Sequence, residues 1–370
     1  MRRLDPADGR AAVLGGAVLG GGGGGDPSWG LAMVEAAFTA GEVWLAGTGD
    51  LSPDAVVITA ALVGAPAAEG CRVEPDDYWT AFELLRAQCG PVGALITNEN
   101  GGLATVNGWY QAARAGLPVV DCPGNGRAHP TGEMGSLNLD QLAGYRATQA
   151  CAGGPARLTM VVSGSLADCS RLVREASIRA GGLVAVARNP APLAHVAHHG
   201  APGAIAQAIA LGDAIGRSTE PGARLSAARA FFGPAALTAT ARLVRVELST
   251  YGGFDAGSLT LAGDDGREWE LPFWNEYIIA RTAQGPQAVF PDLIAAFDMT
   301  NGEILNSAAL PELSSGHPIG LLLVPQQLLR LGRTMTRADL LGVVASALRV
   351  PALPEALRSR GGGCLEGQSC

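Results

Sequence analysis

Two acidic side chains follow short apolar runs that are typical of buried strands. Glu99 comes shortly after the run 92–96, and Asp121 directly follows the run 117–120. In a parallel α/β sheet, ligands bind outside the carboxyl ends of the strands. Both carboxylates are therefore predicted to face one cleft as catalytic groups. The alternative is that each acid only caps a turn or the next helix.

The loops that carry these acids hold further polar groups. Asn98 and Asn125 are predicted to bind substrate from the same loops. Arg127 follows Asp121 by six residues, and we predict a catalytic role in which it holds that carboxylate ionised or clamps a substrate carboxylate. An ordinary structural salt bridge is the alternative for Arg127. His129 adds a general acid–base group or a metal ligand to the loop.

A run of six glycines, 20–25, precedes Asp-Pro. Glycine lets the backbone approach a ligand closely, so Gly22, Gly23 and Gly24 are predicted to contact substrate, with an anion-binding nest or simple flexibility as alternatives. No predicted strand feeds this loop and no Gly-Lys-Ser/Thr follows it, so NAD and ATP are not expected as cofactors. The chain has no lysine, which excludes a Schiff base and pyridoxal phosphate chemistry.

Three of the five histidines fall within residues 195–199. On a helix, His195 and His199 would share one face at a spacing of four residues and could chelate zinc. A solvated cluster at the edge of the core is the alternative. No H-E-x-x-H motif and no G-x-S-x-G motif is present, so neither a zincin nor a serine hydrolase is supported.

The elements that must position these groups alternate along the first part of the chain. Buried strands are predicted at 55–63, 92–96, 117–120, 157–162 and 183–188, with helices at 31–40, 74–88, 107–115 and 166–180. This rhythm predicts an α/β fold: a mostly parallel sheet with flanking helices.

After about residue 234 the pattern changes to short alternating strands. Strands are predicted at 242–249, 258–261, 268–273, 288–296 and 320–324, and the turn 263–266 predicts a hairpin. We therefore predict an α/β region over 1–234 that carries the site, a smaller β-rich C-terminal domain over 235–350, and a flexible tail over 351–370.

Composition bounds the partners and the cellular location. A net charge of −8 argues against nucleic acid and against anionic membrane surfaces. Seven scattered cysteines fit a reducing compartment, and no run is long and apolar enough to span a membrane, so a cytoplasmic protein is expected. The expected partner is a small-molecule substrate, and a homo-oligomer is possible.

These segments resemble one family, the S-methyl thiohydantoin desulfurase-like proteins. The resemblance covers about residues 4–345, and its motifs are LGGGGGGDP (19–27), VVITAALVGAP (56–66), ENGG (99–102), GLPVVDCPGNGRAHP (116–130), WNE (274–276) and FPDLI (290–294). Family members usually read D-A-D-G-x-G-R-A-F-P-E in the loop after the third strand. This chain has Cys122 and Pro123 there, His129 in place of an aromatic residue and Thr131 in place of an acid, so it resembles a divergent member.

The resemblance implies hydrolytic removal of sulfur from a thiohydantoin- or hydantoin-like ring, assisted by a divalent metal such as zinc. An activated water would attack the ring carbon, and a thiolate would leave; zinc lowers the pKa of bound water to about 7. Glu99 would act as general base on that water, and Arg127 would orient an anionic group of the substrate. The implied ligand candidates are Asp121, His129, His195 and His199.

Two other functions stay open from the sequence. A cyclic amide or imide hydrolase on the same scaffold would use Glu99 and Asp121 on oxo rings. A non-catalytic small-molecule-binding accessory protein would turn nothing over, and the missing acid at Thr131 favours this alternative slightly.

Overall fold

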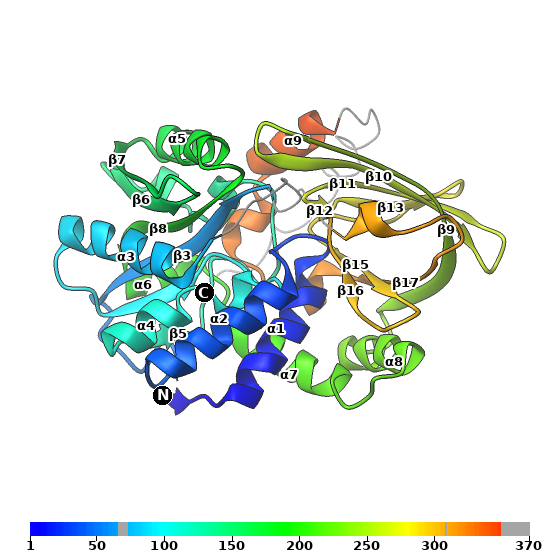
Figure 1. Ribbon diagram of the computed structural model, residues 1–370, viewed down its shortest axis with the longest axis horizontal. Helices are drawn as coiled ribbons and strands as arrows, with labels where there is room; N and C mark the ends of the chain where they lie inside the picture. The colour runs from blue at the N-terminus through cyan, green and yellow to red at the C-terminus, as the bar shows by residue number, and fades with distance from the viewer. Residues whose placement is uncertain (66–72, 308, 349–370) are drawn as a thin grey trace, which may run out of the picture.

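The computed structural model describes residues 1–65, 73–307 and 309–348. The predicted flexible tail, 351–370, lies outside the described residues. Two sheets form the frame of the molecule, and helices pack around and between them (Figure 1). None of the helices in the described ranges is long and apolar enough to cross a membrane.

The first sheet has eight strands among the described residues, in the order β1-β2-β5-β4-β3-β8-β6-β7. Three pairs of neighbouring strands are parallel, as the strand–helix alternation predicts: β2 with β5, β5 with β4, and β4 with β3. The α/β class is confirmed, and the sheet is mixed because β6 and β7 form a hairpin and β8 runs antiparallel to both β6 and β3. The strands are β1 (Arg2–Arg3), β2 (Trp44–Ala46), β3 (Val56–Gly64), β4 (Ala94–Thr97), β5 (Val119–Val120), β6 (Ala147–Gly153), β7 (Leu158–Gly164) and β8 (Leu183–Pro192).

Helices cover both faces of this sheet. Alternate residues of β6 and β8 point to opposite faces, so Ala150 and Ala185 pack toward α3 while Cys151 and Val184 pack toward α5. The helices are α1 (Pro6–Gly20), α2 (Pro27–Ala40), α3 (Pro75–Cys89), α4 (Trp109–Ala115), α5 (Leu166–Arg179), α6 (Leu193–His199), α7 (Ala204–Ile215), α8 (Pro221–Phe232) and α9 (Ala338–Ala347). Short 3₁₀ turns lie at Ala104–Val106, Gly132–Gly135, Leu139–Gln141, Leu310–Glu312, Gln326–Leu328 and Arg333–Thr336.

The second sheet is antiparallel throughout the described residues, which confirms a β-rich C-terminal part. The predicted hairpin at 263–266 joins β10 to β11. The strands are β9 (Leu237–Tyr251), β10 (Phe254–Gly263), β11 (Glu268–Trp274), β12 (Glu276–Tyr277), β13 (Ile279–Thr282), β14 (Gly285–Val289), β15 (Leu293–Asp298), β16 (Ile304–Leu305) and β17 (Pro318–Val324). The domain ranges 1–234 and 235–350 stay predictions.

Helix α1 connects the cores of the two sheets. Its first half, including Val13, packs in the core of the first sheet, and its second half, including Leu19, packs with α7, α8 and the second sheet. Contact with α7 is backbone to backbone: a Cβ on Gly15 would lie 1.9 Å from the carbonyl oxygen of Ala208. Glycine destabilises the interior of a helix. Its presence at position 15 is explained by the close packing of α1 against α7, which leaves no room for a side chain.

Candidate active site

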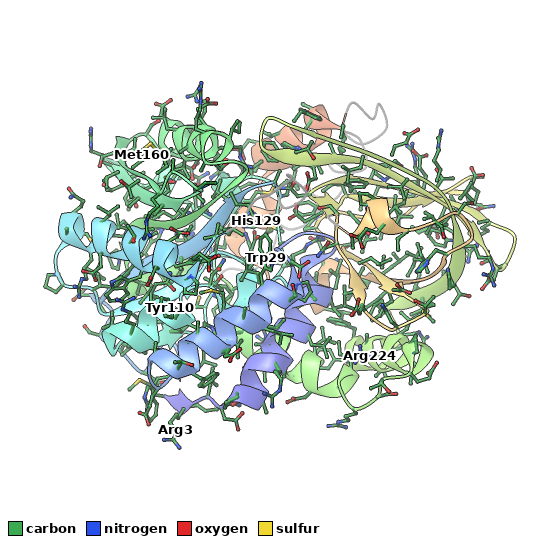
Figure 2. The ribbon with its side chains drawn as sticks, viewed as in Figure 1. Arg3, Trp29, Tyr110, His129, Met160 and Arg224 are labelled. Carbon is green, nitrogen blue, oxygen red and sulfur yellow. The ribbon has the colours of Figure 1, made fainter. Side chains whose placement is uncertain are left out.

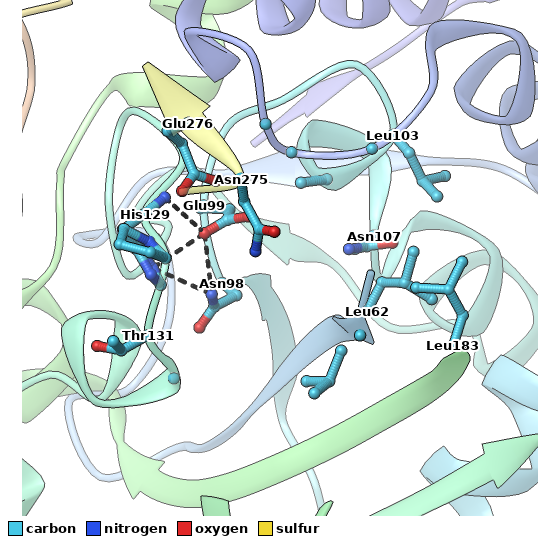
Figure 3. Close-up of a pocket in the computed structure, with 18 of the residues that line it drawn as sticks. Leu62, Asn98, Glu99, Leu103, Asn107, His129, Thr131, Leu183, Asn275 and Glu276 are labelled. Atoms are coloured by element: carbon cyan, nitrogen blue, oxygen red, sulfur yellow. Dashed lines mark hydrogen bonds and ion pairs between the residues drawn. The ribbon is translucent and has the colours of Figure 1, made fainter. Parts of the chain in front are cut away.

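A cavity lies between the two sheets at the carboxyl ends of β3 and β4. The volume of this cavity is about 70 Å³, which is enough for about five water molecules or one small heterocycle. Figure 2 shows the labelled His129 in the interior, between the sheets, whereas Arg3 and Met160 lie at the rim of the molecule. Figure 3 shows Glu99, His129 and Glu276 on one side of the cavity and Leu62, Leu103 and Leu183 on the other.

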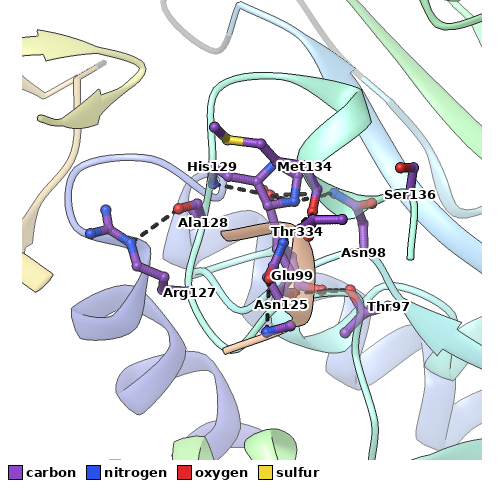
Figure 4. A network of polar contacts seen from close by, with 12 residues as sticks. Thr97, Asn98, Glu99, Asn125, Arg127, Ala128, His129, Met134, Ser136 and Thr334 are labelled. Carbon is purple, nitrogen blue, oxygen red and sulfur yellow. Dashed lines mark hydrogen bonds and ion pairs between the residues drawn. The ribbon is translucent and has the colours of Figure 1, made fainter. Parts of the chain in front are cut away.

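Hydrogen bonds between loops position the polar groups that follow β4. The N–H of Asn98 donates to the carbonyl of Ala60 on β3 at 3.0 Å, and its own carbonyl accepts from the N–H of Asn125 at 3.0 Å. The hydroxyl of Thr97 donates to the carbonyl of Glu99 at 3.1 Å. Figure 4 shows Thr97, Asn98, Glu99 and Asn125 in a network of polar contacts together with His129.

Glu99 and His129 are in direct contact, and Asn98 touches both. Glu99 Oε2 lies 3.0 Å from His129 Nε2 and accepts the backbone N–H of His129 at 3.2 Å. Asn98 Nδ2 lies 3.3 Å from Glu99 Oε2 and 3.1 Å from His129 Nε2. Arg188 donates to Asn98 Oδ1, which orients the amide so that its NH₂ group faces the other two side chains.

Burial shifts the protonation of both groups. Desolvation raises the pKa of Glu99 from 4.5 to about 7, although the positive charge of Arg188 opposes the shift. Desolvation, with the same arginine, lowers the pKa of His129 to about 3. The imidazole is therefore neutral at physiological pH, and the carboxyl titrates where a general base is most effective.

A second carboxyl, Glu276, enters the cavity from the second sheet. It is 2% exposed, and burial, followed by the negative charge of Glu99, raises its pKa well above the usual value. Two guanidinium groups also line the cavity, Arg188 from β8 and Arg174 from α5. Arg174 lies 3.8 Å over the ring of Phe254, and burial lowers its pKa to about 10. Buried carboxyl and guanidinium groups thus surround one small cavity.

The glycine run supplies the wall beside Glu276. Gly23 and Gly24 line the cavity, and Gly22 packs against Tyr277 just outside it. A Cβ on Gly23 would lie 2.0 Å from Glu276 Oε1, and a Cβ on Gly22, whose φ is +94°, would lie 2.9 Å from the ring of Tyr277. The glycine run therefore allows the protein backbone to lie close to the buried carboxyl of Glu276.

Sequence comparisons match this chain to one family over both halves. The S-Me-THD-like N-terminal domain matches residues 8–163, and the S-Me-THD-like C-terminal domain matches residues 165–338. The chain belongs to the S-Me-THD-like family. The predicted resemblance is thereby confirmed. No curated protein matches the chain significantly.

A crystal structure of a protein from Chromobacterium violaceum has the same fold as this S-Me-THD-like chain. The two share 20% sequence identity and superpose with a TM-score of 0.70, over 94% of this chain and 96% of the other. At this identity the likeness concerns the fold.

In the segment 121–127 of this S-Me-THD-like protein, the predicted site residues Asp121, Asn125 and Arg127 lie outside the cavity lining. Asp121 Oδ1 accepts the N–H groups of Ile205 and Ala206 at 2.8 and 3.3 Å and so caps the start of α7, as the alternative interpretation predicts. Asn125 accepts the N–H of Gly332 at 3.0 Å and donates to a backbone carbonyl. Arg127 is fully buried.

Arg127 ties the His129 loop to the second sheet instead of facing the cavity. Its guanidinium donates to the carbonyls of Ala128 at 3.1 Å, Pro291 at 3.3 Å and Asp292, and it lies 4.6 Å over the ring of Phe290. Neither the predicted ion pair with Asp121 nor a substrate clamp is formed by these contacts. Its positive charge still acts on Glu99 and Glu276 through the protein interior.

The predicted metal ligands are not brought together. His195 and His199 stack at 4.3 Å between ring centroids on α6; one bonds the carbonyl of Leu137 and the other the side chain of Asn138. His129 lies in the cavity and Asp121 outside it. Across the described ranges, no three His, Cys, Asp or Glu side chains are grouped so that they could hold a metal ion. The residues of the S-Me-THD-like site therefore do not fit the predicted ligand set.

The sequence allows Asn275 and Glu276 to line the cleft from its far side, with a turn or an interdomain hydrogen bond as the favoured alternative, but it gives no sign of the two guanidinium groups. Arg188 lies inside β8, which runs antiparallel to β3, so the rule for the carboxyl ends of parallel strands does not select it. Glu276 stands in the WNE motif, which already signals an unusual position. Arg174 on α5 has no signal in the sequence, because only the packing of α5 beside the cavity makes it part of the site.

Proposed function

We propose that this S-Me-THD-like protein is a hydrolase that removes sulfur from a thiohydantoin-type ring. The observation that carries the proposal is the contact between Glu99 and His129 at the wall of the cavity, with a carboxyl pKa of about 7. A buried carboxylate of this kind is suited to activating water.

Glu99 accepts a proton from a water molecule in the cavity, and the water oxygen attacks the ring carbon that bears sulfur. His129 and Asn98 hold the carboxylate in place through Oε2. Negative charge then develops on the substrate, and the guanidinium groups of Arg174 and Arg188 line the same space. Fixed positive charge in a low-dielectric site stabilises such a transition state.

The other wall suits a flat heterocycle. Leu62, Leu103 and Leu183 offer an apolar surface for the faces of the ring, while the polar side faces its edge. The size of the cavity matches a single five-membered ring better than a larger substrate.

Metal assistance is no part of this proposed mechanism, because the described side chains do not assemble the predicted ligands. Every proton transfer in it is assigned to a side chain of the chain itself.

The experiment supplies purified protein with 2-thiohydantoin, its S-methyl derivative and the oxo ring hydantoin, and measures thiol or sulfide release and ring opening. Sulfur release that falls about 100-fold or more in Glu99→Gln is the expected result. Opening of hydantoin alone would establish the cyclic amide hydrolase instead. Tight binding of a ring with no turnover, unchanged by Glu99→Gln, would establish a binding protein.

A further inference from the structure

We propose that Glu276 is a second catalytic carboxyl, which gives a proton to the substrate and takes one back while Glu99 handles the attacking water. This inference rests on the proposed function and adds a residue from the second sheet to it. Three independent features of the structure carry it: a backbone fixed on both sides, a glycine cradle, and a buried oxygen with no partner.

The backbone on either side of Glu276 is fixed by hydrogen bonds. Asn275 has a φ of +59°, and it exchanges two bonds with Asp255: its N–H donates to the Asp255 carbonyl at 2.7 Å, and its Oδ1 accepts the Asp255 N–H at 2.9 Å. On the other side, the N–H of Tyr277 donates to the carbonyl of Gly21 at 2.7 Å. A left-handed asparagine costs conformational energy, and such positions cluster at functional sites.

The side chain of Glu276 then fills a space that the glycine run leaves free. Gly23 is so close that any Cβ there would collide with Oε1 at 2.0 Å. The other oxygen, Oε2, is buried and makes no hydrogen bond among the described residues. A buried carboxyl oxygen without a partner is costly in a resting protein, and Glu276 is one of the residues that line the cavity.

Burial and the charges around Glu276 favour the protonated form of its carboxyl over the ionised form. Burial and the charge of Glu99 raise the pKa of Glu276, and the positive charges of Arg127 and Arg174 only partly oppose that. The Nε and Nη1 groups of Arg127 are engaged by backbone carbonyls. Two carboxyls that share one site cannot both ionise easily, which separates their acid and base roles.

The reaction balances over two steps. First, Glu99 takes one proton from water, and the oxygen bonds to the ring carbon. The electron pair of the double bond at that carbon moves to its heteroatom, which takes the proton of Glu276. Second, the new hydroxyl returns its proton to Glu276 as the carbonyl forms. The C–S bond breaks, and sulfur leaves with the electron pair and the proton held by Glu99. One water is consumed, one thiol or hydrogen sulfide is released, and both carboxyls regain their starting states.

The test compares Glu276→Gln with Glu268→Gln, an exposed glutamate on the neighbouring strand β11. Two measurements are made: the infrared band of a protonated carboxyl, identified by its shift in D₂O, and the pH profile of turnover of 2-thiohydantoin and its S-methyl derivative. Because Gln keeps the size and neutrality of the protonated acid, Glu276→Gln is expected to fold. Thermal unfolding checks this.

At a pH well above 7, where Glu99 is ionised, we expect the wild type and Glu268→Gln to show the infrared band and Glu276→Gln to lose it. Glu276→Gln is also expected to lose about 100-fold or more of kcat and the alkaline limb of the pH profile. A wild type that turns over both rings while Glu276→Gln keeps its rate and pH profile would overturn the role of Glu276 and leave the proposed function standing. If the wild type turns over neither ring, the proposed function fails and this role fails with it, even where the band is present.

Discussion

Glu99 presents one carboxylate oxygen, Oε2, to both the imidazole and the backbone N–H of His129, at 3.0 and 3.2 Å. The imidazole is neutral because burial and Arg188 lower its pKa. The imidazole therefore holds the Glu99 carboxylate as a polar side chain. It adds no positive charge that would make this carboxylate a weaker base.

The pH dependence of stability should reveal the buried acid. The folded-state pKa of Glu99 is raised from 4.5 to about 7, so the folded protein binds this proton more tightly than the unfolded chain does. The contribution of Glu99 to stability is then full below about pH 4.5 and is lost as the pH rises toward 7. Urea unfolding of the wild type and Glu99→Gln at several pH values measures it. An identical pH dependence in both proteins would contradict the raised pKa.

Arg188 should set the pH at which the proposed turnover begins. Its positive charge lowers the pKa of Glu99, and it orients Asn98. In Arg188→Met we expect the acidic limb of kcat/KM to move to higher pH and turnover to fall about 10- to 100-fold, the loss typical of a misplaced catalytic group. Arg171→Met, on the exposed face of α5, is the control. An unmoved acidic limb would mean that Arg188 does not act on Glu99.

Replacement of Gly23 by alanine should damage the site through Glu276. The added Cβ would lie 2.0 Å from Oε1, and overpacking of this kind costs about 1–3 kcal/mol. Gly49→Ala is the matched control, since nothing lies within 4 Å of a Cβ there. Thermal unfolding and turnover are measured together. Equal stability and activity in the two variants would show that the Gly23 cradle is dispensable.

Asp121 should matter for stability and not for metal content. Its carboxylate caps the start of α7, so Asp121→Ala is expected to cost about 1 kcal/mol in the free energy of unfolding. Elemental analysis of the wild type, Asp121→Ala and His199→Ala is expected to give the same metal content in all three, because the two residues do not join His129. A metal present in the wild type and lost in either variant would restore the predicted ligand set.

The sequence by itself predicted part of the regular elements and one half of the site, and it merged β14 and β15 into one strand over 288–296. The apolar run 55–63 became the interior strand β3, and the rule for strand ends found Glu99 and Asn98, since local hydrophobic pattern decides which runs are buried. It did not find β6, whose sequence ATQACAG is poor in β-branched residues. That segment is a strand because β7 and β8 pair with it on both sides, which is a tertiary effect.

Only the tertiary structure decided which polar groups meet. Asp121 and Glu99 stand at the ends of neighbouring parallel strands, yet one caps α7 and the other lines the cavity, because the loop after β5 turns toward the start of that helix. Glu276 lies 177 positions after Glu99 and faces it from another sheet. Spacing along a chain carries no information about such a contact, since it arises from the packing of one sheet against the other through the glycine run.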